Sequence, residues 1–219
     1  MTHSRCFSGL WIAAVVLATS LLAASTDVRL VNAVKNADKG AIQTLLPQHV
    51  DLSATDTDGS TALHWAVRRD DVETANLLIG SGADVKTANR YGVPPLSLAC
   101  VNGNAAMIES LLKAGADPNT ALPGGETALM TAARTGKVDA LKVLVAHGAD
   151  VNFKEARRGQ TALMWAAADG NTAVVEELIE RGADMKARTK GGFTPLLFAV
   201  REGRSDTVKA LAESRSKRE

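Results

Sequence analysis

Groups that could act as nucleophiles, bases or metal ligands are few and scattered in this chain. The histidines and cysteines are His3, Cys6, His49, His64, Cys100 and His147. No spacing among them is typical of a zinc site, and two distant cysteines do not indicate a disulfide framework. The chain also lacks a G-x-S-x-G elbow, a phosphate-binding loop and a G-x-G-x-x-G turn. We therefore predict a protein that is not an enzyme, with no catalytic residue, no metal and no cofactor.

Composition narrows the class of protein but not its function. The chain has 219 residues, of which 46% are apolar and 22% charged, as in an ordinary soluble globular protein. The 25 Lys and Arg residues nearly balance the 24 Asp and Glu residues, for a formal charge of +1. Net charge therefore offers no reason to expect a nucleic acid or an anionic membrane as the partner.

The first 25 residues are typical of a secretory signal peptide. Arg5 is their only charged residue, an apolar run covers 10–18, and the small residues Ala23, Ala24 and Ser25 precede Thr26. Cleavage would leave an exported protein, periplasmic or secreted, with no stable membrane span. The alternative is an uncleaved anchor, although 9–24 is shorter than the roughly 20 residues that a spanning helix needs. Cys6 precedes the apolar run, so lipid anchoring is not expected.

Two sequence markers recur with one period. The segment TALHWA at 61–66 returns as PPLSLA at 94–99, TALMTA at 127–132, TALMWA at 161–166 and TPLLFA at 194–199. Gly-Ala-Asp recurs at 82–84, 115–117, 148–150 and 182–184. The steps are 33 residues except for one of 34, which places a single inserted residue between Asp150 and Thr161, near Glu155. A period of this length indicates a stacked repeat protein.

The period and the T-P-L-H-x-A core resemble the ankyrin repeat, a β-turn followed by two antiparallel helices. We expect Thr61 to cap the first helix of its unit and Gly82 to close the second one in the left-handed conformation. Alanine recurs at one inward position, at 66, 99, 132, 166 and 199, where neighbouring helices would stack closely. The expected fold is all-α: a solenoid of about six helix-turn-helix units joined by β-turn or hairpin loops.

The register divides the chain into a signal peptide and six units. The predicted ranges are 1–25 for the signal, 26–55 for a degenerate N-terminal unit, 56–88, 89–121, 122–155 and 156–188 for four regular units, and 189–219 for an incomplete C-terminal unit with a polar tail. The first unit suits a terminal cap. For the last unit two explanations stay open, a polar cap or an array cut within a repeat.

Several residues that could suggest chemistry have structural explanations in this register. Trp65 and Trp165 share one position, which favours packing over ligand stacking, and Cys100 is expected to be a small buried thiol. The carboxylates at 176 and 177 are expected on a solvated helix face. The family resemblance implies that His64 makes a structural hydrogen bond between repeats.

The resemblance also implies recognition through the concave side, formed by the turn tips and the exposed ends of the first helices. We count eight cations and four anions on that side, and arginine pairs well with carboxylates. An excess of four charges could also reflect chance or solubility. The predicted partner-binding residues are Arg68, Arg69, Arg90, Tyr91, Arg134, Arg157, Arg158, Phe193 and Arg201.

These observations predict an exported, non-catalytic protein that binds another protein, one with an acidic surface, through its concave face. A monomer is expected. The alternative is an accessory module or fragment of a larger exported enzyme or receptor. Binding of a nucleic acid or a small molecule is not expected, because net charge is near zero and no closed pocket is evident.

Overall fold

Twelve α-helices arranged in six pairs build the chain over residues 27–216, the part that the computed structural model describes. The helices are α1 (Arg29–Lys35), α2 (Lys39–Leu45), α3 (Ala62–Arg68), α4 (Val72–Gly80), α5 (Pro95–Asn102), α6 (Ala105–Lys113), α7 (Ala128–Thr135), α8 (Val138–Ala146), α9 (Ala162–Asp169), α10 (Thr172–Glu180), α11 (Pro195–Arg201) and α12 (Ser205–Ser216). A short 3-10 helix, η1 (Leu46–Gln48), follows α2. The predicted signal segment lies outside the described residues.

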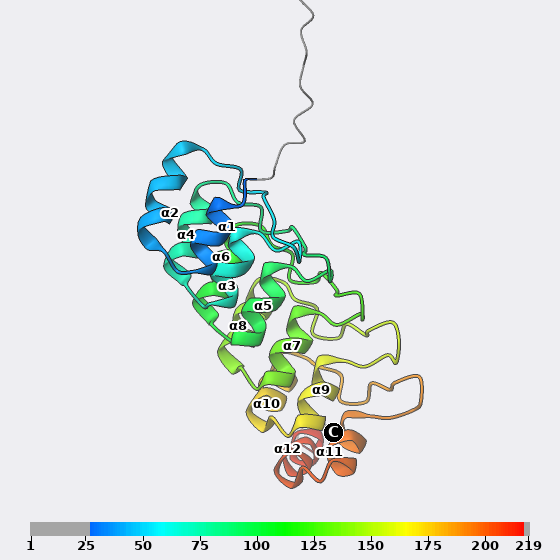
Figure 1. The fold of residues 1–219 in the computed structure, drawn as a ribbon. Coiled ribbons are helices and arrows are strands. Elements are labelled where there is room, and N and C mark those ends of the chain that lie inside the picture. Colours follow the sequence, from blue (N-terminus) through cyan, green and yellow to red (C-terminus); the bar gives the residue numbers. More distant parts are fainter. Residues whose placement is uncertain (1–26, 217–219) are drawn as a thin grey trace, which may run out of the picture.

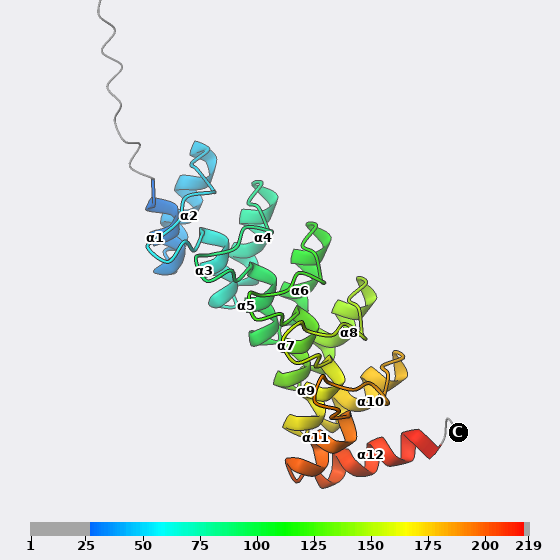
Figure 2. The same cartoon turned by 90° about the vertical axis from the view of Figure 1, so that its right-hand side faces the viewer.

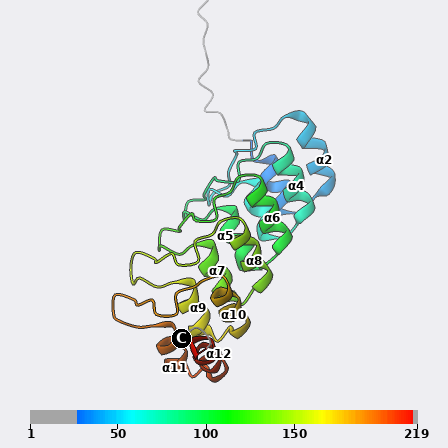
Figure 3. The ribbon, with the colours of Figure 1, turned by 180° about the vertical axis from the view of Figure 1, so that it is seen from behind.

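The pairs stack into a single elongated array. The odd-numbered helices form an inner row and the even-numbered helices an outer row (Figure 2). The loops that join the pairs project from the side of the inner row (Figures 1 and 3). Among the described residues these loops contain no β-strand, only isolated antiparallel bridges at Thr55–Thr61 and Ala121–Thr127. The predicted all-α solenoid of six helix-turn-helix units is confirmed.

Helix ends follow the chemistry of the repeated motif. The hydroxyl of Thr61 accepts the backbone N–H of His64 at 3.4 Å, and the threonines that begin α7, α9 and α11 do the same in their helices. This bond satisfies one of the N–H groups that a helix leaves unpaired at its start. Gly82 follows α4 with a φ of 96°, which lets the N–H of Ala83 bond back to the carbonyl of Leu78.

Alanines at one repeated position form the contact between successive inner helices. Each of the five is completely buried, with an exposed fraction of 0%: Ala66, Ala99, Ala132, Ala166 and Ala199. A methyl group lets neighbouring helices approach closely, whereas a larger side chain would separate them. The array is therefore one continuous core that runs through all six units.

His64 joins the second unit to the third, as the resemblance implied. Its Nδ1 lies 2.9 Å from the Thr61 hydroxyl and accepts the Thr61 N–H, and its Nε2 lies 3.1 Å from the carbonyl oxygen of Val93 in the next turn. With Nδ1 as acceptor, Nε2 carries the proton and donates to Val93. Both ring nitrogens are thus used in holding the stack.

The outer row is joined by ion pairs between neighbouring units. Lys39 contacts Glu73 at 2.7 Å, and Lys142 contacts Glu177 at 3.5 Å. The expectation of a solvated carboxylate at 177 is wrong, because Glu177 is 9% exposed and also accepts from Arg181 at 2.8 Å. The Lys39–Glu73 pair is exposed on both sides and contributes little by itself, whereas the Lys142–Glu177 pair includes a buried carboxylate.

The last unit leaves apolar side chains uncovered on α11. Leu197 and Val200 are 46% and 56% exposed, although their counterparts in the second unit, His64 and Val67, are completely buried. The following unit covers this position in the interior of the array, and no described residue covers it on α11. The second helix of the last unit buries both Leu211 and the polar Thr207, whose hydroxyl lies 2.9 Å from that of Thr172 in the preceding unit.

Enlarging one stacking alanine should separate two inner helices. We expect Ala166→Leu to lower the free energy of unfolding by about 1–3 kcal/mol, because the surrounding core has no room for three more carbons. Ala173→Leu is the matched control, since Ala173 is exposed in the same unit. Urea unfolding followed by circular dichroism measures both, and equal stability of the two variants would contradict the close contact.

Burial of His64 should make the stack sensitive to acid. Burial lowers the pKa of His64 below its ordinary value of 6.5, against the opposing effect of the hydrogen bond to Val93. The unfolded chain then binds the proton more readily, so this stabilisation is present above pH 6.5 and is lost as pH falls through the folded value.

We expect wild-type stability to fall between about pH 7.5 and pH 5.5 by more than that of His64→Gln. Urea unfolding of both proteins at the two pH values measures the two losses of stability. The effects of the other titrating groups are the same in both proteins, so they cancel when the two losses are subtracted. Parallel pH profiles would refute the assignment.

Candidate functional site

The loops and the exposed ends of the inner helices share one face of the array, here called the concave face. Each loop turns at a glycine with a positive φ, and two pairs of neighbouring turns are joined by backbone hydrogen bonds. The Arg90 N–H donates to the Asp58 carbonyl at 3.0 Å, and the Lys190 N–H donates to the Arg158 carbonyl at 2.9 Å. The turns therefore hold a fixed spacing, and side chains at their tips form an ordered row.

Four of the predicted partner-binding residues project from these turns without contacts that tie down their polar groups. Arg90, Arg157 and Arg158 are exposed, and within residues 27–216 their guanidinium groups make no hydrogen bond, ion pair or ring contact. Tyr91 is 67% exposed. These side chains can meet a partner without first breaking an interaction within the protein.

The other predicted arginines are engaged with their neighbours. Arg68 lies over the ring of Trp65 at 4.7 Å, and Arg69 donates to the carbonyl of Lys35. Arg134 lies 5.3 Å from the centre of the Trp165 ring and pairs with Glu126 at 3.4 Å.

The C-terminal part of the face has a similar stack. Arg201 lies 4.9 Å from the ring centre of Phe198 and pairs with Glu202 at 2.7 Å. Phe193, 38% exposed, packs beside Phe198 with ring centres 5.7 Å apart. Cations stacked on rings in this way contribute about 0.5–1 kcal/mol each at exposed sites. Arg134 and Arg201 are thus held in place rather than free.

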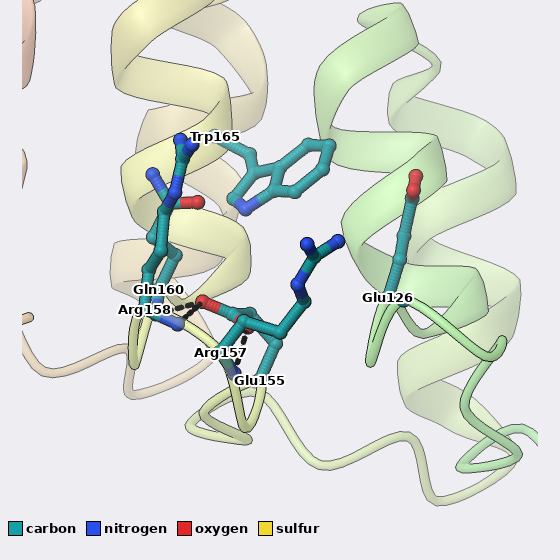
Figure 4. A pocket seen from close by; sticks show the side chains of 7 residues that line it. Glu126, Glu155, Arg157, Arg158, Gln160 and Trp165 are labelled. Atoms are coloured by element: carbon teal, nitrogen blue, oxygen red, sulfur yellow. Dashed lines mark hydrogen bonds between the residues drawn. The ribbon is translucent and has the colours of Figure 1, made fainter.

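The structure brings the C-terminal members of the predicted set together around two adjacent pockets. One pocket, of about 300 Å³, is lined by Gly124, Glu126, Glu155, Arg157, Arg158, Gln160 and Trp165 (Figure 4). The other, of about 290 Å³, is lined by Arg157, Arg158, Gln160, Thr189, Lys190, Gly191, Phe193, Phe198 and Arg201. We call them the Trp165 pocket and the Phe193 pocket. Arg68, the last residue of α3, and Arg69, which follows it, lie in the second unit and line neither pocket.

The turn between the two pockets contains the inserted residue. In the second and third units the backbone N–H that opens the turn bonds to a carbonyl four residues later, from Asp56 to Ser60 and from Asn89 to Val93. In the fifth unit the same bond runs from Glu155 to Gln160, five residues later. The insertion predicted near Glu155 therefore lies in this turn, and it adds an arginine to the tip.

Glu155 holds the longer turn from inside. Its carboxylate accepts the backbone N–H groups of Arg157 and Arg158, both at 2.6 Å, and that of Gln160 at 3.1 Å. Burial alone would raise the pKa of Glu155, but these three hydrogen bonds outweigh it and hold the pKa below the ordinary value of 4.5. The carboxylate is 4% exposed and serves the turn rather than a ligand.

Trp165 is the site residue that the sequence analysis missed. Its ring packs against the core with one part and lines the pocket with another, so the interpretation as packing was incomplete. Its Nε1 is buried and makes no hydrogen bond within the described part of the chain. The equivalent Trp65 donates from Nε1 to the Asp56 carboxylate at 2.9 Å. The sequence signal that could have revealed this is the change from Asp56 to Glu155 at the start of a turn that is one residue longer.

The one cysteine among residues 27–216, Cys100, is part of the core. Cys100 is completely buried, and burial raises its pKa to about 12. Among residues 27–216, no three His, Cys, Asp or Glu side chains lie together in a way that could hold a metal ion.

Within the same residues, no helix is both long and apolar enough to cross a membrane.

Comparisons with known proteins place this geometry among repeat proteins. Residues 30–122 and 129–218 match the family described as "Ankyrin repeats (3 copies)". The crystal structure of EF0377, an ankyrin repeat protein, superposes with a TM-score of 0.79 and 30% identity, covering 85% of this chain and 97% of that one.

Curated relatives match over shorter segments. The human neurogenic locus notch homolog protein 1 is 36% identical over 70 residues, which are 32% of this chain and 3% of that protein. The ankyrin repeat and LEM domain-containing protein 1 homolog of Caenorhabditis elegans is 41% identical over 59 residues, 27% of this chain and 8% of that protein. The match therefore spans only a small part of either relative.

Removing the Glu155 carboxylate should loosen the longer turn. Glu155→Ala leaves three backbone N–H groups without an acceptor, and we expect a loss of about 1–3 kcal/mol in the free energy of unfolding. The control is Glu176→Ala, because Glu176 is exposed on α10 in the same unit.

The difference between wild type and Glu155→Ala should also depend on pH. Because the folded pKa is lowered, the stabilisation is present above pH 4.5 and shrinks as pH falls below it. Urea unfolding at neutral and acidic pH measures this, and a constant difference would contradict the role of the carboxylate.

Proposed function

The chain belongs to the ankyrin repeat family, and we propose that it is a non-catalytic binding module whose concave face captures an acidic protein. Ankyrin repeats generally mediate binding between proteins. The observation that carries the proposal is the placement of Arg90, Arg157 and Arg158 on one face with free guanidinium groups. Arginine binds carboxylates through two parallel hydrogen bonds, which favours it at interfaces.

Exposed aromatic side chains on the same face support a protein partner. Tyr91 and Phe193 stand beside the free arginines, and aromatic residues with arginine are the types enriched among residues that dominate interface energy. Two of the carboxylates on this face are already paired with other arginines, Glu126 with Arg134 and Glu202 with Arg201. The face thus offers unpaired positive charge and exposed rings together.

We propose a non-catalytic role, which the structural use of His64 and the burial of Cys100 support. Both nitrogens of His64 hold the stack, and the thiol of Cys100 is buried with a raised pKa. The composition of residues 1–25 supports export as a further part of the proposal. Amino-terminal sequencing of the protein recovered from outside the cytoplasm tests that part.

Reversing the free charges should weaken capture of the partner. We expect Arg90→Glu, Arg157→Glu and Arg158→Glu together to reduce retention at least about tenfold, because charges at the face would then repel an acidic surface. The measurement is affinity capture from the exported protein fraction, with quantitative mass spectrometry of what the purified protein retains. Thermal unfolding checks that the melting temperature is unchanged.

The matched control carries the same charge change on the outer row. Lys39→Glu, Lys113→Glu and Lys209→Glu alter exposed residues of α2, α6 and α12. Proteins retained by wild type and by this control, but not by the concave-face variant, identify the partner. Equal retention by both triple variants would reject the concave face as the binding surface.

A further inference from the structure

We propose that the Trp165 pocket is a carboxylate subsite, which takes an aspartate or glutamate side chain from a segment of the bound protein. The indole N–H of Trp165 and the guanidinium groups of Arg157 and Arg158 would be its donors. This inference rests on the proposed function and deepens it, because it assigns one chemical group of the partner to one pocket. It concerns a residue for which the repeat pattern predicted packing.

The comparison with the second unit shows what the pocket lacks. Trp65 and Trp165 occupy the same repeat position, and Trp65 donates to Oδ2 of Asp56 at 2.9 Å. Asp56 can serve both roles, because its other oxygen, Oδ1, accepts the backbone N–H groups of Asp58 and Ser60. The second unit therefore supplies its own carboxylate to the indole.

The fifth unit cannot do so. Both oxygens of Glu155 are taken by the longer turn, Oε1 by Arg158 and Gln160 and Oε2 by Arg157. The Trp165 Nε1 is left buried with no acceptor among residues 27–216. A buried donor without a partner costs about 1–3 kcal/mol, which an incoming acceptor would recover. The empty place corresponds to the carboxylate that the second unit provides.

The charge around the pocket selects an anion as that acceptor. Figure 4 shows the Arg157 side chain reaching into the space between Trp165 and Glu126, with the indole nitrogen at the edge of the ring that faces the Glu155 turn. The guanidinium groups of Arg157 and Arg158 make no interaction with any described residue. The two acidic residues of the lining already have donors. Glu155 accepts three backbone N–H groups, and Oε1 of Glu126 contacts Arg134 and the hydroxyl of Thr131.

The adjoining Phe193 pocket favours a carboxylate carried by a polypeptide. Arg157, Arg158 and Gln160 line both pockets, so one segment can cross the turn and enter each of them. Phe193 and Phe198 offer an apolar surface there, 5.7 Å apart between ring centres. We therefore assign the occupant as an acidic side chain with an aromatic or aliphatic one close to it in the same segment.

Indole N–H signals test this proposal with an internal reference. The protein has three tryptophans, and Trp65→Phe and Trp165→Phe assign the two side chains in a ¹H–¹⁵N correlation spectrum. The probe is the acetylated and amidated peptide Ser-Glu-Gly-Phe-Ser. We expect it to shift the Trp165 indole signal downfield in a saturable way and to leave that of Trp65 unmoved, because Trp65 already has its acceptor.

Matched peptides and variants define the chemistry. The same peptide with Gln in place of Glu should bind at least about tenfold more weakly, as should the Glu peptide with Trp165→Phe or with Arg157→Gln and Arg158→Gln, because a hydrogen bond to a charged group is lost. Trp65→Phe and Lys113→Gln, the latter on the outer row, are the controls and should leave the peptide affinity unchanged.

Several results would overturn the subsite. They are an unmoved Trp165 signal at millimolar peptide, equal binding of the Glu and Gln peptides, or an equal shift with acetate alone, which would indicate a site for small carboxylates. If the peptide does not bind but the wild-type protein still captures a protein partner, only the subsite is overturned. If the concave-face and outer-row triple variants retain the partner equally, the proposed function itself is rejected.

Discussion

Close contact between the inner helices is the constraint on which the rest of this structure depends. The five stacking alanines have no exposed surface, so each unit lies as near to the next as a methyl group allows. A helix pair of this size cannot bury its apolar surface alone, and stability accumulates from the contacts between units. A feature that disturbs the spacing of the inner row is therefore opposed by the contacts with the units on either side of it.

The fixed spacing explains the order of the concave face. Turns that lie one unit apart can join through backbone hydrogen bonds, as Arg90 does with Asp58, and His64 can reach the carbonyl of Val93 across the boundary between units. Loops of this length would otherwise sample many conformations. Here they hold side chains such as Tyr91 and Arg158 in a row, which lowers the entropy that a partner must overcome in binding.

The same rigidity gives a single inserted residue a local effect. Because the helices before and after it cannot move apart, the extra residue of the fifth unit is accommodated within the turn from Glu155 to Gln160. Glu155 is drawn inward to satisfy three backbone N–H groups, and Trp165 loses the acceptor that its counterpart Trp65 keeps. An insertion in a flexible loop would have had no such consequence for a neighbouring side chain.

The sequence by itself determined the helix pairs, their register and the stacking positions, because these depend on local chemistry that repeats. Thr61 as a cap, Gly82 as a left-handed end and the buried alanines were all readable from spacing, whereas the side of the array on which Arg90 and Arg157 lie was implied by the resemblance to the ankyrin repeat. Only the tertiary structure decided which of those arginines are free. Arg134 and Arg201 are held by rings and carboxylates that come together through packing, which spacing along the chain does not encode. The unpaired indole of Trp165 likewise depends on where the two oxygens of Glu155 point, and that direction is set by a turn whose course follows from the fixed helices on either side.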